Sequence, residues 1–236
     1  MKQKPQLFLL HFAGGNCYSF KFLLPYLKDF DVIQLELPGR GNRINEALIT
    51  EYDQAAADIY RQILSKLTNS AYLIYGHSLG AYLALRVTHM LEKVGQAPVY
   101  MLVSGNPGPG IRENRKRYLL EKEEFIIELR CLGGIPEEVL ENQELFDFFE
   151  PVLRADFELA ERNEMSLDKP VNTPIYALMG SQEEDVDKLS NWAKFTRSSF
   201  HSDVLEGNHF FILKHPQRIA ELIKQCYDQV ILLQYQ

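Results

Sequence analysis

The sequence predicts an α/β fold in which helices cover both faces of a mostly parallel central sheet. Two patterns carry this prediction. Short apolar runs bounded by turn residues alternate with helical patterns along most of the chain. One long stretch, 112–168, interrupts this alternation with helical patterns alone. We therefore expect a doubly wound sheet of βαβ units that carries one all-helical insertion, a lid.

Five runs have the length and composition of buried strands. Each is apolar on both faces, which is typical of a parallel sheet covered on both sides. The runs are "LFLLH" (7–11), "VIQLEL" (32–37), "YLIYG" (72–76), "VYMLV" (99–103) and "IYALM" (175–179). The short apolar stretch "DVL" (203–205) indicates a final strand.

Helical periodicity fills the intervals between these strands. The expected helices lie at about 53–68, 78–94, 186–199 and 216–233, the last with an apolar face. Within 112–168 the pattern indicates three helical pieces, interrupted at 133–136 and at Pro151. No repeat or linker marks a boundary, so we expect a single domain over 1–236 with its lid at about 112–168.

Composition excludes several function classes. The 236 residues carry a formal net charge of −7, with a pI near 5.4, which argues against nucleic acid or anionic lipid as a partner. No window reaches the roughly 18 apolar residues of a membrane helix, and the N-terminus lacks a signal-peptide pattern. The three cysteines show no metal or redox spacing. We expect a cytoplasmic monomer without a metal or cofactor.

The strongest functional signal is Gly76-His77-Ser78-Leu79-Gly80. This G-x-S-x-G pattern joins a predicted strand to a predicted helix, the context in which a nucleophilic serine sits on a tight turn. The hydroxyl of Ser78 would project from the carboxyl edge of the sheet, and the N–H of Leu79 would stabilise an oxyanion. The structural alternative is a serine that caps the helix between two ordinary glycines.

A serine nucleophile needs a base, and His209 is the candidate. It lies in "LEGNHFFI", after the final strand and before the last helix, where the histidine of such a Ser, acid, His order falls. The acid should follow the strand that ends at Gly180. Three acids lie there: we favour Glu183, keep Asp185 as the alternative, and note that Glu184 is adjacent.

The loop after the first strand is the candidate for a second oxyanion donor. "HFAGG" (11–15) brings two glycines into a turn that faces the serine. The N–H of Ala13 is the expected donor, with that of Phe12 as the alternative. The two glycines could equally form a bare turn.

The lid carries more aromatic surface than a solvated insertion would tolerate. The side chains concerned are Phe146, Phe148, Phe149, Leu153 and Phe157. Some of them would line an acyl tunnel, or all of them would pack the lid onto the core.

Taken in order, the motifs resemble those of the type II thioesterases associated with nonribosomal peptide and polyketide synthases. The resemblance spans nearly the whole chain and rests on "HFAGG" (11–15), "ELPGRG" (36–41), "GHSLG" (76–80), "LGGIPEEVLENQEL" (132–145), "PVLRADF" (151–157) and "GNHFFI" (207–212). It implies an α/β-hydrolase fold with a helical lid. It also implies hydrolysis of acyl groups from the phosphopantetheine arm of acyl or peptidyl carrier proteins, as in the editing and regeneration of misprimed synthases.

By position, the resemblance makes Ser78 the nucleophile and His209 the base. The sequence departs from the family's pattern twice. Leu79 stands where methionine is common, which matters little because only its N–H is used. Glu183 stands where aspartate is usual, which leaves the identity of the acid open.

A carrier protein is usually acidic, so an acidic enzyme needs a local basic patch to meet one. The dense basic run at the entry to the lid contains Arg112, Arg115, Lys116 and Arg117. It is a candidate docking patch, and a solvated surface with no partner is the alternative. Two other functions remain open: a generic esterase with the same triad, and a non-catalytic receptor of the same fold.

Overall fold

The computed structural model describes residues 4–68, 71–111, 115–162 and 169–234. Its centre is a six-stranded sheet of order β2-β1-β3-β4-β5-β6, and each neighbouring pair is parallel. The strands are β1 (Gln6–Leu10), β2 (Asp31–Gln34), β3 (Tyr72–His77), β4 (Tyr100–Ser104), β5 (Ile175–Gly180) and β6 (Phe200–Leu205). The predicted parallel sheet is confirmed.

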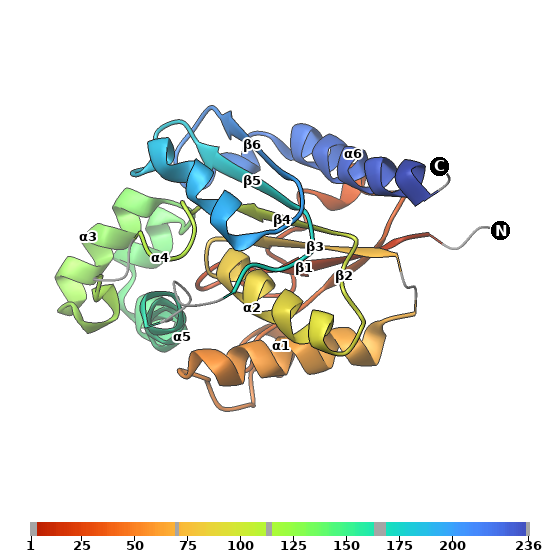
Figure 1. Ribbon diagram of the computed structural model, residues 1–236. Coiled ribbons are helices and arrows are strands. Elements are labelled where there is room, and N and C mark those ends of the chain that lie inside the picture. The colour runs from red at the N-terminus through yellow and green to blue at the C-terminus, as the bar shows by residue number, and fades with distance from the viewer. Residues whose placement is uncertain (1–3, 69–70, 112–114, 163–168, 235–236) are drawn as a thin grey trace.

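Helices cover both faces of this sheet (Figure 1). Helices α1 (Tyr52–Lys66) and α2 (Leu79–Lys93) pack on one face, and α6 (Pro216–Gln234) packs on the other. Alternation along β1 explains the two layers, because Phe8 and Leu10 point toward α1 and α2 while Leu7 and Leu9 point toward α6. Burial on both faces is why β1, β3, β4 and β5 have continuous apolar sequences.

The lid lies beyond the carboxyl ends of the strands, at the left of Figure 1. It contains α3 (Lys122–Leu132), α4 (Glu137–Glu141) and α5 (Gln143–Glu161). Six buried side chains give it an apolar cluster of its own: Phe125, Leu129, Leu140, Phe146, Leu153 and Phe157.

The lid helices divide differently from the sequence prediction. The break at Gly133 and Gly134 is present, and both glycines have positive φ angles. Pro151 does not interrupt a helix, however, but lies inside α5. A proline removes one backbone hydrogen bond from a helix interior, and packing of Phe146 and Leu153 on either side of it in the lid cluster offsets that loss. The second break falls instead at Asn142, whose side chain caps α5 by accepting from Leu145 N.

The expected helix at 186–199 is also corrected. A 3-10 helix occupies Val186–Phe195, and the chain is extended again from Phe200. Leu189, Trp192 and Phe195 are buried against the α1 and α2 side of the sheet. Their spacing of three explains why the segment has a helical pattern and yet forms the tighter helix. Among the described helices, none combines the length and apolar character needed to cross a membrane.

The start of α2 approaches the sheet so closely that residue 80 cannot carry a side chain. A Cβ on Gly80 would lie 2.1 Å from the carbonyl oxygen of Leu10. Because both groups belong to the backbone, relief requires α2 to move away from β1.

We expect Gly80→Ala to lower the free energy of unfolding by about 3 kcal/mol or more, measured by urea denaturation. Gly95→Ala is the control, because Gly95 has a positive φ of 70° and a methyl group added there would have no neighbour within 4 Å. It should cost only the backbone strain of about 1–2 kcal/mol. Equal losses in both variants would contradict the packing argument.

Candidate active site

Ser78 occupies a strained turn between β3 and α2. Its φ of 56° and ψ of −114° lie outside the regions that ordinary residues favour. Two hydrogen bonds hold this conformation: Ser78 N donates to Ser104 O at 2.7 Å, and Asn106 Nδ2 donates to Ser78 O at 2.9 Å. The hydroxyl therefore stands at the N-terminus of α2, where the helix dipole favours negative charge.

Two glycines make this turn possible. A Cβ on Gly76 would lie 2.1 Å from the carbonyl oxygen of Gly80, and one on Gly80 would strike Leu10. The G-x-S-x-G spacing is thus explained by contact between backbones rather than by any need for flexibility.

His209 reaches Ser78 from the loop between β6 and α6. Its Nε2 lies 3.0 Å from Ser78 Oγ, and its Nδ1 lies 2.7 Å from Glu183 Oε2. Because a carboxylate only accepts, Nδ1 carries the proton and Nε2 offers its lone pair to the serine hydroxyl. This is the tautomer that a general base requires.

The three candidate acids have different surroundings. Glu183 is buried, and Gly180 N donates to its Oε1 at 2.8 Å while Oε2 accepts from His209. Glu184 is exposed and forms an ion pair with Arg115. Asp185 has a φ of 64° and accepts from Lys188 Nζ at 2.7 Å. Of the three, Glu183 is therefore the acid that the fold turns toward His209.

A second histidine, His77, lies directly behind the site. Its ring centroid is 5.0 Å from that of His209, and its Nδ1 is 2.8 Å from Ser104 Oγ. Complete burial, aided by the nearby His209, holds the pKa of His77 well below its usual value. His77 is therefore neutral and places no second charge beside His209.

Ser78 and His209 open into a cavity beneath the lid. Ala13 lines the same cavity, and Leu79 directly follows the serine at the start of α2. The two expected oxyanion donors therefore belong to segments that border the serine. The cavity walls from the lid are Arg117, Leu129, Leu132, Gly133, Ile135, Leu153, Phe157, Ala160 and Glu161.

Some of the large apolar side chains of the lid line the cavity, and others pack within the lid. Phe157 and Leu153 line the cavity that contains Ser78, and Leu153 with Phe149 lines an adjoining apolar cavity. Phe146 is fully buried in the lid cluster, whereas Phe148 is 62% exposed. The lid therefore both packs on itself and supplies apolar cavity walls.

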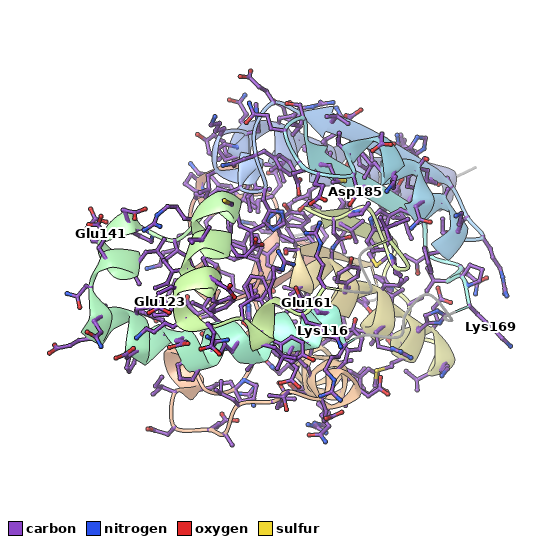
Figure 2. All side chains as sticks on the ribbon, turned by 90° about the vertical axis from the view of Figure 1, so that its left-hand side faces the viewer. Lys116, Glu123, Glu141, Glu161, Lys169 and Asp185 are labelled. Carbon is purple, nitrogen blue, oxygen red and sulfur yellow. The ribbon has the colours of Figure 1, made fainter. Side chains whose placement is uncertain are left out.

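Two cations of the basic run at the lid entry, Arg115 and Arg117, form ion pairs. Arg117 donates to Glu161 from its backbone N at 2.7 Å and from Nε at 2.5 Å, and Arg115 pairs with Glu184. Lys116 is exposed, and Figure 2, which faces the lid, shows it beside Glu161. Arg112 lies outside the described residues.

Sequence reasoning missed a buried ion pair between the lid and the core. Asp156 of α5 is fully buried, and it pairs with Arg40, which is 4% exposed. The available signal was an acid in an apolar helical stripe, three residues after Leu153 and next to Phe157. Among the described residues, no group of three or more His, Cys, Asp or Glu side chains is placed to hold a metal ion.

Comparisons with known proteins identify the family. A family model described as "Thioesterase domain" matches residues 5–227. The chain belongs to the thioesterase family. It is 32% identical over 227 residues to "Gramicidin S biosynthesis protein GrsT" of Aneurinibacillus migulanus, a match that covers 93% of this chain and 88% of that protein.

Solved structures agree with this assignment. The structure of ClbQ "from the colibactin NRPS/PKS pathway" has a TM-score of 0.89 and 27% identity, covering 98% of this chain and 100% of that one. The type II thioesterase BorB "from the borrelidin biosynthetic cluster" has a TM-score of 0.87 and 28% identity, covering 96% of this chain and 94% of that one. The resemblance to type II thioesterases and the α/β-hydrolase fold are confirmed, and the chain is a hydrolase of the thioester type.

The contacts of the three acids lead to a prediction for this thioesterase. Glu183→Gln should lower kcat by about a thousandfold, because an amide cannot both hold the Nδ1 proton and stabilise a charged imidazole. Glu184→Gln and Asp185→Asn are matched controls that should stay within about threefold of the unaltered enzyme. Steady-state hydrolysis of a small acyl thioester measures kcat of all three variants. A large loss of kcat in Asp185→Asn, with normal kcat in Glu183→Gln, would assign the role of the acid to Asp185 instead.

Proposed function

We propose that this thioesterase removes acyl groups from the phosphopantetheine arm of acyl or peptidyl carrier proteins, through Ser78, His209 and Glu183. The observation that carries the proposal is a series of two hydrogen bonds beneath the lid. One joins Ser78 Oγ to His209 Nε2 at 3.0 Å, and the other joins His209 Nδ1 to Glu183 Oε2 at 2.7 Å. The carrier substrate is supported by the similarity to ClbQ, whose description names an NRPS/PKS pathway, and to GrsT and BorB, whose names refer to biosynthetic pathways. On this proposal, the enzyme edits and regenerates misprimed synthases.

The chemistry follows from the geometry. Ser78 Oγ attacks the thioester carbonyl carbon as His209 Nε2 takes its proton, and the buried Glu183 carboxylate stabilises the resulting imidazolium. The carbonyl oxygen becomes an oxyanion that the N–H groups of Ala13 and Leu79 receive.

The intermediate then breaks its carbon–sulfur bond, and the pantetheine sulfur leaves with the proton that His209 returns. Water attacks the acyl-serine by the same route, which releases the carboxylic acid and restores the Ser78 hydroxyl. Because a thiolate is a better leaving group than an alkoxide or an amine, acyl binding in an apolar cavity suffices for turnover without a deep substrate-specific site.

Ser78→Ala should lower thioester hydrolysis by about a thousandfold or more, since it removes the nucleophile from a partly exposed position without touching the core. The measurement is acid release from acyl carrier proteins loaded with acetyl to long-chain groups. Circular dichroism of the variant should match that of the unaltered protein. Activity within tenfold of that of the unaltered enzyme would contradict the assignment of Ser78 as the nucleophile.

Two rival functions have their own tests. Faster turnover of free esters than of carrier thioesters would favour a generic esterase, and an enzyme that a fluorophosphonate does not label would favour a receptor.

We propose further that Arg115 and Lys116 contribute to docking of the acidic carrier. We leave Arg117 out of this proposal because its guanidinium lies against the buried Glu161 carboxylate and over the Phe157 ring, with 4.7 Å from its Cζ to the ring centroid. Acidic side chains such as Glu123 and Glu141 lie at the other end of the lid (Figure 2), so a carrier's negative surface is favoured at the Lys116 end.

Arg115→Glu/Lys116→Glu should raise KM for an acyl-carrier substrate about tenfold at low salt, with a smaller effect as salt rises. Hydrolysis of a small acyl-cysteamine thioester should change little. Lys66→Glu/Lys93→Glu is the matched control, because it makes the same change in net charge at the distant ends of α1 and α2. If the control raises KM equally, total charge is responsible; if neither variant changes KM, the carrier docks elsewhere.

A further inference from the structure

The carboxylate of Asp156 joins three parts of the molecule that are far apart in sequence. Asp156 lies on lid helix α5, and its Oδ2 accepts from the backbone N of Gly14 at 2.7 Å. Its Oδ1 accepts from Arg40 Nη2 at 2.9 Å, and Arg40 Nη1 also contacts Oδ2. The loop after β1, the loop after β2 and the lid therefore meet at one buried carboxylate.

Because this contact is buried, its two charges must compensate each other. Asp156 is 0% exposed and Arg40 is 4% exposed, so each charge depends on the other for compensation. The two parallel contacts between guanidinium and carboxylate fix an orientation as well as a distance. Arg40 Nε donates to Pro38 O at 3.3 Å, which anchors the guanidinium to its own loop. Asp156 is thereby held with one lone pair directed at Gly14.

That direction matters because Gly14 follows Ala13, the proposed oxyanion donor. The peptide before Ala13 is held through Phe12 O, which accepts from Gly15 N at 2.9 Å and from His11 Nδ1 at 2.8 Å. The peptide after Ala13 is held through Gly14 N, which donates to Asp156. Both peptide planes that flank the Ala13 Cα are therefore fixed, and one of them is fixed by the lid.

Packing reinforces the contact at the same place. A Cβ on Gly14 would lie 2.5 Å from Leu153 Cδ2, so α5 touches the backbone of this loop directly. Gly14 has a φ of 74°. Because glycine is conformationally flexible, a fixed hydrogen-bond partner is needed to hold it in this conformation. Pre-oriented donors cost no reorganisation when charge develops in the transition state.

We propose that Asp156, held by Arg40, is a positioning residue for the thioesterase reaction. Asp156 accepts a hydrogen bond from Gly14 N and so orients the Ala13 N–H toward the developing oxyanion. Correct placement of the lid is thereby coupled to completion of the oxyanion hole. This inference rests on the proposed function of Ala13. Asp156 acts through the loop and does not touch the reacting atoms.

Two double variants test the proposal, and only one of them keeps an acceptor for Gly14. Arg40→Met/Asp156→Asn and Arg40→Met/Asp156→Leu both remove the buried charges, so neither leaves an unpaired ion. The asparagine side chain retains an oxygen that can accept from Gly14 N, whereas leucine, which has the same branching of side-chain heavy atoms but a larger volume, cannot. The Leu variant should lose about a hundredfold in kcat on a small acyl thioester with KM within about threefold, and the Asn variant should retain kcat within about fivefold of the unaltered enzyme.

A second measurement separates this proposal from the choice of substrate. The phosphoryl oxygen of a fluorophosphonate occupies the oxyanion hole when the reagent reacts with Ser78, so its labelling rate should follow the same order as kcat. If the unaltered enzyme is labelled but hydrolyses no thioester, the proposed function fails while the labelling rates still decide the role of Asp156. If Ser78 is not labelled at all, both fail.

The control is a second ion pair made from the loop after β2, the partly buried pair between Arg43 and Asp58. Asp58 accepts from Arg43 and Gln62, so these contacts join the loop after β2 to α1 rather than to the loop after β1. Arg43→Met/Asp58→Asn should lower the urea midpoint and leave kcat and the labelling rate near those of the unaltered enzyme.

Equal losses of kcat in the Asn and Leu variants, with both folded, would overturn the proposal, because the ion pair and not the Gly14 contact would then be responsible. So would a folded Leu variant with unaltered kcat and labelling. Arg40→Met/Asp156→Ala replaces the Leu variant if that chain does not fold. In the unaltered protein, the Gly14 amide should be strongly protected from hydrogen exchange in a spectrum of glycine-labelled enzyme, and fast exchange would also refute the contact.

Discussion

Close contact between the backbone of helix α2 and strands β1 and β3 is the constraint on which the site depends. Gly80 lies where any Cβ would meet the Leu10 carbonyl, and Gly76 lies where a Cβ would meet the Gly80 carbonyl. This proximity forces the connecting residue, Ser78, into a positive φ that costs free energy. The cost is tolerated because β3 is fully buried and the start of α2 is buried against it, so neither can relax independently.

The lid is held by two kinds of force with different consequences. Its apolar cluster, built around side chains such as Phe125 and Phe146, gives stability but little direction. The pair between Asp156 and Arg40 is directional, and it lies where α5 crosses the loop after β1. Nonpolar packing therefore keeps the lid folded, and the polar contact adds a directional link between α5 and the loop after β1.

The sequence determined the parts of this protein that depend on local pattern. Apolar runs bounded by turns located the inner strands β1, β3, β4 and β5, since burial on both faces demands continuous apolar residues. Ser78 could be singled out because its turn has a strict glycine spacing, and His209 because chain order in such a sheet brings the loop after the last strand to the same edge. Periodicity alone could not separate the 3-10 helix at Val186–Phe195 from an α-helix, nor show that Pro151 lies within α5.

Tertiary structure alone decided the choices among chemically equivalent residues. Glu183, Glu184 and Asp185 are adjacent acids, and only the fold turns the first toward His209 and leaves the second outside with Arg115. The sequence suggests that Arg117 is a surface charge, but in the structure it forms an ion pair with the buried Glu161. Arg40 and Asp156 are 116 positions apart and meet at full burial. The physical reason is common to all three: local pattern records which faces are apolar, whereas the pairing of charges depends on distances across the assembled core.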